Sequence, residues 1–522
     1  MTEAWKSNKS TSRLPFPSAI MTNWIVLLVC LWFPPLSAAQ QQAPPPAPES
    51  RPAPAAQPSG PKPIKIGDVV LSGSVRGRME DWGWFETPGG ENDYTFGALT
   101  LRLALSQTKK RVDWQIEGIF PFLFHLPTDA VLPPPQGQLG LGASYFAASG
   151  RQDGSASVRQ AFVRFKSIFG DAASSLRLGR FEFAEGAEVA PADATLAALK
   201  RDRIAQRLVG PFGFSHIGRG FDGVQYVRST KRNNLTLVAV RPTEGVFQLR
   251  SLKEIDVDFY YGAFTRQLPG KPARGEWRAF VLHYHDGRRA LKTDNRPQAA
   301  RAADTRNLRL TTIGGHAIGA FDAGRGTVDL LFWGAAQFGR WGALDHRAGA
   351  FAVEAGYQFN ARGTPWLRAG YFRSTGDGDP ADGDHTTFFQ VLPTPRIYAR
   401  FPFYNLMNNQ DVFGEFRWKP VARLAIRADV RHLRLSNRRD LWYAGGGAFE
   451  NRTFGYAGRP SSGQSELGTL FDVGFDVELA RRTAMTFYVG GIRGGGVPAA
   501  IYPAGAPRPP ARFIYVELLQ RF

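Results

Sequence analysis

Alternation of apolar and polar side chains with a period of two is the strongest structural signal in this 522-residue chain. Phe471, Val473 and Phe475 form one side of such a segment, and Asp472 and Asp476 form the other. Successive side chains of a β-strand point to opposite faces, so the pattern predicts strands with one apolar and one polar face. It recurs in segments of about ten residues, the length that a tilted strand needs to cross a membrane.

Two all-β folds accommodate these segments: a soluble sandwich with a solvated polar face, and a transmembrane barrel with a polar lumen. Strand length favours the barrel, as do aromatic residues near the strand ends. The final segment alternates as far as Phe522, whose ring we expect to point outward into an interfacial aromatic girdle. At about 25 residues per strand and turn, we predict a transmembrane antiparallel β-barrel of about 16–18 strands. It should have an aqueous channel, long extracellular loops and short periplasmic turns.

The first 39 residues have the three parts of a secretory signal peptide. Lys6, Lys9 and Arg13 precede the apolar run 24–33, and the small residues after it offer a cleavage site. The run is too short for a permanent membrane anchor, which needs about 20 apolar residues. We therefore predict a cleaved signal peptide over residues 1–39, with an uncleaved anchor as the alternative.

Proline and alanine dominate the next segment, 40–63, which has almost nothing to bury. We expect it to be a disordered, extended linker. No second linker interrupts the chain after it, so residues 64–522 are predicted to form a single barrel domain. The only cysteine, Cys30, lies in the signal peptide, which leaves the barrel without disulfides, zinc-thiolate sites or cysteine nucleophiles.

Net charge indicates the kind of partner. The whole chain carries +19, of which the signal peptide contributes +2, so +17 remains after cleavage. A basic balance of this size predicts anionic partners. Export through a signal peptide excludes nucleic acid. The expected partners are therefore anionic polysaccharide or other anions, outer-membrane lipid and lipopolysaccharide, with the barrel-assembly machinery during folding and periplasmic export proteins as a further possibility.

Four motifs occur in order along the chain: SVRQAFVRF (157–165), LRLGRFEF (176–183), HIGRGFDGVQY (216–226) and STGDGDPADGDHTTF (374–388). Together with the basic character, they make the chain similar to the alginate export family of outer-membrane porins. The resemblance implies a single-chain barrel in the cell outer membrane, with a lumen lined by arginine and lysine that conducts an acidic polysaccharide. It also implies roles for Arg159, Arg180 and Arg219, which lie in the motifs, and it places Arg180 near the constriction.

Arginines of the predicted strands are the candidate pore lining. Unpaired guanidiniums in a water-filled lumen would bind successive carboxylates and so select anions. Alternatively, they pair with lumen acids such as Glu80, Asp113, Glu117, Glu415 and Asp429 and serve as wall structure. The excess of basic residues predicts that some remain unpaired. The candidates are Arg76, Arg78, Arg102, Arg164, Arg177, Arg180, Arg368, Arg417, Arg427 and Arg431.

A helical pattern over residues 191–209 carries Lys200, Arg201, Arg203 and Arg207. One placement folds this segment into the pore mouth, where its positive charge would concentrate an anion. The other places it on the surface as a solvated helix against anionic lipopolysaccharide. The sequence leaves both open.

Asp377, Asp379, Asp382 and Asp384 form an acidic loop and are candidates for a structural Ca²⁺ site, because hard oxygen ligands cluster there. Their spacing differs from the EF-hand loop, which needs an acid at its fifth position, where this chain has Ala381. A loop rich in turns, with aspartates as caps, is the preferred interpretation. We expect no other cofactor.

The chain has no GxSxG and no HExxH motif, and nothing nominates a nucleophile beside a base, so we predict that it is not an enzyme. We predict an outer-membrane porin with an arginine-rich, anion-selective lumen that passively conducts an acidic polysaccharide, an alginate-like polyuronate. The alternatives are a general or small-anion porin and a structural or adhesive barrel.

Overall fold

The structure is a computed structural model, which describes residues 64–522 except 251–252, 396–397 and 506. The signal peptide predicted over 1–39 and the linker predicted over 40–63 fall outside these described residues, so both stay predictions.

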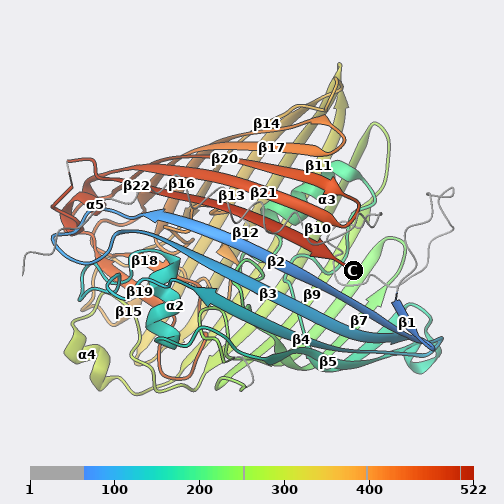
Figure 1. Cartoon of the computed structure of the whole chain (residues 1–522), viewed down its shortest axis with the longest axis horizontal. Coiled ribbons are helices and arrows are strands. Elements are labelled where there is room, and N and C mark those ends of the chain that lie inside the picture. The colour runs from blue at the N-terminus through green and yellow to red at the C-terminus, as the bar shows by residue number, and fades with distance from the viewer. Residues whose placement is uncertain (1–63, 251–252, 396–397, 506) are drawn as a thin grey trace, which may run out of the picture.

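Eighteen antiparallel strands form a closed barrel (Figure 1). The first wall strand pairs with the last, from Ser74 opposite Arg521 to Gly83 opposite Arg512. This pairing leaves the wall without a free edge, and it confirms the predicted fold. The wall strands are β2 (Val69–Gly83), β3 (Asp93–Thr108), β4 (Val112–Phe124), β5 (Ser157–Lys166), β6 (Ser174–Phe181), β7 (Phe221–Ser229), β8 (Asn233–Pro242), β9 (Val257–Leu268), β10 (Ala273–Asp286), β11 (Leu308–Ala323), β12 (Gly326–Trp341), β13 (Leu344–Phe359), β14 (Trp366–Ser374), β16 (Asn409–Val421), β17 (Leu424–Leu435), β20 (Glu466–Ala480), β21 (Thr483–Gly494) and β22 (Pro510–Arg521).

Shorter elements lie in the connections. Strand β1 adds to β2, β15 pairs in parallel with β13, and β18 and β19 form a separate hairpin. The bounds are β1 (Ile64–Ile66), β15 (Asp384–His385), β18 (Leu441–Gly445), β19 (Tyr456–Pro460), α2 (Leu141–Ser149), η1 (Ile168–Gly170), α3 (Ala194–Leu199), the π-helical turn η2 (Lys200–Ile204), α4 (Gln298–Ala303) and α5 (Gly496–Ile501).

The two ends of the barrel differ in the length of their connections. Eight turns of two to seven residues join the strands at one end, which we call the short-turn end. At the other, the long-loop end, the connections are long, apart from the two-residue turn between β12 and β13. The C-terminus and β1 mark the short-turn end at the right of Figure 1, and α2, α4, α5 and the β18–β19 hairpin gather at the left. In barrels of this kind the short turns are periplasmic and the long loops extracellular.

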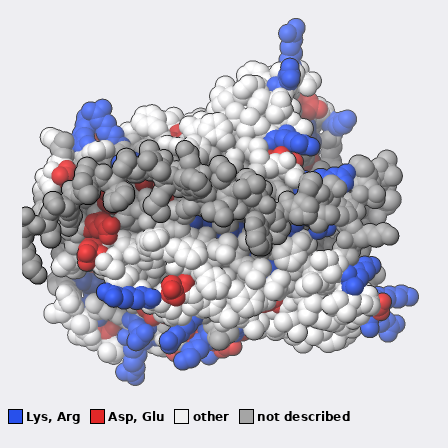
Figure 2. All heavy atoms as spheres, viewed as in Figure 1, with Lys and Arg blue, Asp and Glu red and all other residues white. Residues whose placement is uncertain are grey.

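The outward face of the wall is apolar. Phe332, Val353 and Phe471 are 53%, 51% and 57% exposed, which lipid contact explains and water contact does not. In Figure 2 the middle of the visible wall has few charged residues. The ring of Phe522 packs over Gly73 on this outward face, because a Cβ on Gly73 would lie 2.5 Å from it. The predicted outward position of Phe522 is therefore confirmed.

The inward face encloses a packed interior rather than a wide aqueous channel. The long loops fold into the barrel and bring their own aromatic residues. At the long-loop end Trp82 stacks on Phe513 with ring centroids 4.0 Å apart, and Phe401 of the β14–β16 loop packs against both. Leu392, in the same loop, is fully buried. The lumen is therefore much narrower than the strand number alone predicts. No helix in the described part of the chain is long and apolar enough to cross a membrane.

Candidate functional site

Strand alternation places nine of the ten candidate arginines on the inward face of the wall. On β17, for example, Val430 is 42% exposed to the outside, while Asp429 and Arg431 are buried inside. The inward arginines are Arg76 and Arg78 on β2, Arg102 on β3, Arg164 on β5, Arg177 on β6, Arg368 on β14, Arg417 on β16, and Arg427 and Arg431 on β17.

Arg180 is the exception, and its predicted place near the constriction is wrong. It alternates with the buried Phe181 and shares the outward face of β6 with Leu178, which is 41% exposed. Its guanidinium donates two hydrogen bonds of 2.6 Å to the carboxylate of Asp222 on β7. Because Arg177 and Arg180 are three residues apart, a regular strand cannot point both inward.

Eight of the nine inward arginines lie within ion-pair distance of a carboxylate. Arg76 is the loosest, 3.9 Å from Glu517, whereas Arg78 is 2.5 Å from the same group. Arg102 pairs with Glu117 and Glu182, and Arg164 with Asp113. The structure therefore brings these arginines together with lumen acids, as the interpretation of wall structure predicts. The remaining pairs are Arg368 with Asp329 and Glu354, Arg417 with Glu415 and Asp202, Arg427 with Glu415 and Asp429, and Arg431 with Asp429 and Asp411.

Arg177 has no carboxylate at ion-pair distance among the described residues. Its guanidinium lies 4.7 Å from the ring of Phe162 and 5.4 Å from that of Phe181. Its buried Nε has no hydrogen-bond partner, and its register partner on β5 is another cation, Arg164. Within the described part of the chain, aromatic rings rather than an ion pair therefore surround the Arg177 guanidinium.

The connection between β6 and β7, residues 182–220, crosses the lumen, and we call it the crossing segment. Its helical part begins at α3, where the carboxylate of Asp193 caps the helix by accepting a hydrogen bond of 2.9 Å from the backbone N–H of Leu196. The predicted helical stretch 191–209 corresponds to α3 and η2. Because both lie inside the barrel, the placement in the pore is the one that the structure shows.

Ion pairs hold the crossing segment to the wall along its whole course. Near its start, Glu185 and Glu188 each lie 2.9 Å from Arg278 on β10. Further on, Nζ of Lys200 is 2.6 Å from the carboxylate of Glu276, also on β10. All five side chains are buried.

The last part of the crossing segment reaches the opposite wall. Arg76 donates a hydrogen bond of 2.6 Å to the backbone oxygen of Ser215, and Arg78 donates one of 2.9 Å to that of Phe214. The guanidinium of Arg78 also lies 3.9 Å above the Phe214 ring. The segment therefore spans the lumen from β10 to β2.

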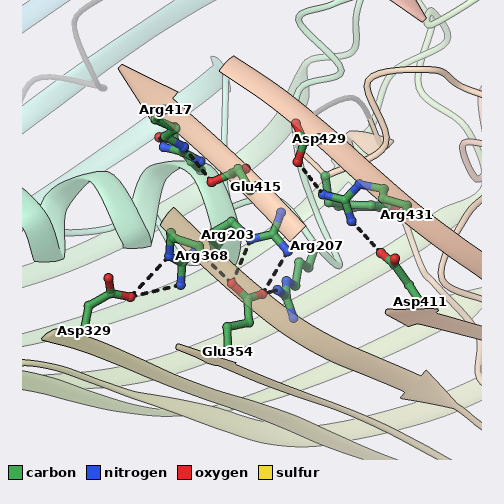
Figure 3. Close-up of polar contacts among 12 residues, drawn as sticks. Arg203, Arg207, Asp329, Glu354, Arg368, Asp411, Glu415, Arg417, Asp429 and Arg431 are labelled. Carbon is green, nitrogen blue, oxygen red and sulfur yellow. Dashed lines mark hydrogen bonds and ion pairs between the residues drawn. The ribbon is translucent and has the colours of Figure 1, made fainter. Parts of the chain in front are cut away.

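Glu354 on β13 is the centre of the contacts in Figure 3. It accepts two hydrogen bonds of 2.9 Å from Arg203 and one of 3.0 Å from Arg207, both on the crossing segment. Arg368 of the wall donates a further bond of 3.0 Å. Three guanidiniums thus share one buried carboxylate, and Arg368 also contacts Asp329.

A second group of contacts continues round the wall on β16 and β17 (Figure 3). Glu415 and Asp429 alternate with Arg417, Arg427 and Arg431, and each carboxylate bridges two guanidiniums. Across both groups six arginines face six carboxylates, counting Asp202 and Asp411. The whole network is therefore electrically neutral, as the cost of burying an unpaired charge requires.

Arg219, which lies in one of the sequence motifs, is fully buried near the long-loop end of the crossing segment. Its Nη2 donates a hydrogen bond of 2.6 Å to the backbone oxygen of Gly446, while Nε and Nη1 have no partner. Burial lowers the pKa of Arg219 to about 10. Nearby, a cavity of about 390 Å³ lies between the folded-in loops, lined by aromatic residues that include Phe212 and Tyr456.

The four aspartates proposed for Ca²⁺ mainly cap turns. Oδ1 of Asp377 accepts the N–H of Asp379, whose own carboxylate accepts that of Ala381, and Asp382 accepts that of Asp384. No group of three or more Asp, Glu, His or Cys in the described ranges is arranged to hold a metal ion. Calcium binding at this loop stays an untested prediction.

A closed barrel with an apolar outer band, long loops at one end and a charged interior defines an outer-membrane channel. The chain belongs to the alginate export family, whose family model matches residues 147–496. This membership confirms the resemblance in the sequence motifs, and with the fold it places the protein in the outer membrane.

Solved structures of outer-membrane proteins share the fold. Pseudomonas aeruginosa OccK9 (OpdG) is similar with a TM-score of 0.53 and 11% sequence identity, over 87% of this chain and 98% of that one. P. aeruginosa OpdK, solved with vanillate, has a TM-score of 0.51 and 10% identity over the same shares. At such identities the likeness concerns the fold alone. No curated protein matches this sequence.

Sequence reasoning missed the acids that organise the site. Glu354, Glu276 and Asp329 lie on inward faces, and alternation marks them as polar lumen positions, but nothing local indicates which arginine each one meets. Arg203 and Glu354 are 151 residues apart in the sequence. Only the course of the crossing segment brings them together.

Proposed function

We propose that this channel passively conducts an acidic polysaccharide, an alginate-like polyuronate, across the outer membrane. The observation that carries the proposal is the grouping of Arg203, Arg207 and Arg368 around the single carboxylate of Glu354. Membership of the alginate export family supports the same cargo. A uronate carboxylate has the same two oxygens as Glu354 and fits the same donors.

Spare donors at this group favour binding of an additional carboxylate. Nη1 of Arg203, and both Nε and Nη1 of Arg207, are buried without an acceptor among the described residues. A charge-assisted hydrogen bond contributes about 1.5–3 kcal/mol, which offsets part of the dehydration of an entering uronate. Because a guanidinium has several N–H donors, each arginine can bind a uronate carboxylate while it keeps its hydrogen bonds to Glu354.

Exchange of the carboxylates that pair with each arginine explains how the polysaccharide would move through the lumen. Further arginines follow at Arg417, Arg427 and Arg431, each already holding a carboxylate. A polymer whose carboxylates replace these one at a time never leaves an arginine unpaired, so no single site binds it tightly enough to stop it. Because such sites are spread over several strands, the lumen can select an anionic polymer and still release it.

The crossing segment makes passage conditional. It fills the lumen and is held by Arg203 and Arg207, the residues that the cargo would engage. Carboxylates of the polymer therefore compete with Glu354 for the anchors of the segment, and their binding favours its displacement. The chain has no nucleotide-binding motif, so the polymer's own gradient or its synthesis must drive transport.

A single-channel recording in planar bilayers tests the proposal. Oligouronates should interrupt the current, and uncharged glucose oligomers of the same length should not. Equal interruption by both would indicate a non-selective pore, and a complete lack of conductance would indicate a structural barrel; either result contradicts the proposal.

A small-anion channel is the second candidate, and the narrow, loop-filled lumen favours it. OpdK, which shares the fold, was solved with vanillate, a small carboxylate. This function predicts a current carried by chloride and small carboxylates that oligouronates leave uninterrupted.

A further inference from the structure

Most of the excess positive charge of this protein lies in the short turns rather than on the lumen wall. Residues 1–63 carry +3 of the total +19, so +16 belongs to residues 64–522. The contacts around Glu354 and Glu415 balance six arginines with six carboxylates. The eight short turns, by contrast, contain eleven lysines and arginines and a single acid in 29 residues. They therefore contribute +10.

The opposite end of the barrel lacks this concentration. By sequence, the nine connections of the long-loop end, including the crossing segment, sum to only +1 although they are several times longer. The one acid of the short turns, Asp171, is itself paired with Arg228 at 2.6 Å. We call the lysines and arginines of the eight short turns the basic collar.

Most side chains of the collar are exposed to solvent. Two of its turns carry Lys109, Lys110 and Arg111 between β3 and β4, and Lys231 and Arg232 between β7 and β8. All five side chains are exposed, and within the described part of the chain no carboxylate lies at ion-pair distance from any of them. Figure 2 shows basic side chains along the short-turn end of the visible face.

The collar surrounds the entrance of the lumen. Exposed aromatic residues on the outer wall, Phe321, Phe359 and Trp418, lie within a few residues of the turns and mark the membrane interface. The turn tips therefore extend beyond the interface into the periplasm. On the inside, Arg164 and Arg177 are register partners close to the β5–β6 turn, and Arg164 pairs with Asp113. Basic side chains thus also occur on the inner wall near the short-turn end.

We propose that the basic collar is the docking surface on which the acidic polysaccharide is captured from the periplasm before it enters the lumen. The inference rests on the proposed function and adds the side of capture and the residues responsible. A charged rim around a low-dielectric mouth concentrates a polyanion and raises its association rate about 10- to 1,000-fold. The difference in charge between the two ends of the barrel gives transport a direction. The polysaccharide is captured at the short-turn end and leaves at the long-loop end.

A fivefold neutral variant tests the collar: K109Q, K110Q, R111Q, K231Q and R232Q combined. The substitutions lie in exposed turns, so the barrel should fold normally. The matched control neutralises five exposed arginines of the long-loop end, R289Q, R306Q, R438Q, R439Q and R452Q. Single channels are recorded with oligouronate added to one side at a time, in low and high salt.

The collar variant should be interrupted about tenfold less often than the native channel when oligouronate is on the short-turn side. Interruption from the long-loop side should stay unchanged, and the control variant should keep the native rate from the short-turn side. High salt should remove most of the difference, since the Debye length falls to about 3 Å at 1 M.

Two outcomes overturn the proposal while leaving the proposed function intact. In one, the native channel is interrupted by oligouronate and the collar variant captures it at the native rate. In the other, the collar variant differs only in its insertion into bilayers containing anionic phospholipid, which would make the collar a contact with lipid head groups. If oligouronate interrupts the native channel from neither side, the proposed function and the collar proposal both fail.

Discussion

Arg203, on the segment that crosses the lumen, and Glu354, on strand β13 of the wall, are joined by two hydrogen bonds of 2.9 Å each in a bidentate contact. Both side chains are almost completely buried. This contact joins the part of the protein that fills the pore to the part that crosses the membrane, and in the proposed function the polysaccharide competes with it.

Removing the charge of Glu354 should loosen the crossing segment without opening the barrel. In Glu354→Gln, Arg203 and Arg207 keep no carboxylate, and a broken buried ion pair costs about 3–5 kcal/mol. We expect a lower Tm in detergent and more frequent current fluctuations, with normal membrane insertion because the strand ladders are untouched. The matched control is Asp345→Asn, whose partner Arg340 is exposed; a change there should cost less than about 1 kcal/mol. Equal Tm values for the two variants would show that Glu354 is not an anchor.

A cysteine at Arg201 should report the position of the crossing segment. The Arg201 side chain is 68% exposed, and residues 64–522 contain no native thiol. In Arg201→Cys, an anionic thiosulfonate reagent added at the short-turn side should modify the thiol and reduce the single-channel current. Phe169→Cys, at a fully exposed position of a short turn, should react without changing the current. Modification of the Arg201→Cys thiol with an unchanged current would place the segment outside the conducting path.

Acidification should loosen the loop between β14 and β16. Burial, with the neighbouring His346 and Arg296, holds the pKa of His385 well below its usual value. The released loop therefore binds a proton more readily than the packed one, so this residue's contribution to stability is complete above about pH 6.5 and is lost as the pH falls. We expect more current fluctuations at pH 5 than at pH 7.5.

His385→Gln should reduce this pH dependence, since the group that takes up the proton is gone. The control is His432→Gln, because His432 is exposed on the outer face of β17 and should leave the pH profile unchanged. A native pH profile in the His385 variant would contradict the assignment.

Sequence alone was enough for the fold because lipid contact demands a regular alternation. The same alternation predicted that Arg368, Arg417, Arg427 and Arg431 face the lumen. The prediction placed Arg177 and Arg180 on the same inward face although they are three residues apart, and Arg180 points outward. Alternation could not show that the lumen arginines are paired, because the partners depend on how the long connections fold back into the barrel.

The crossing segment illustrates the same limit. Its helical character was readable from residues 191–209, but its place inside the pore was not, because burial of Lys200 depends on Glu276 of a distant strand. The basic collar could in principle be predicted from the sequence. Its signal is the charge of the turns compared with that of the loops, and it becomes visible once the strand bounds are known.

The reversal potential of the native channel under a KCl gradient tests most directly whether this barrel selects anions. Chloride should be more permeant than potassium. The preference should be strong at 0.1 M salt, where the Debye length is about 10 Å, and weak at 1 M, where it is about 3 Å. A reversal potential of zero at low salt, or one that shows a preference for potassium, would contradict anion selectivity.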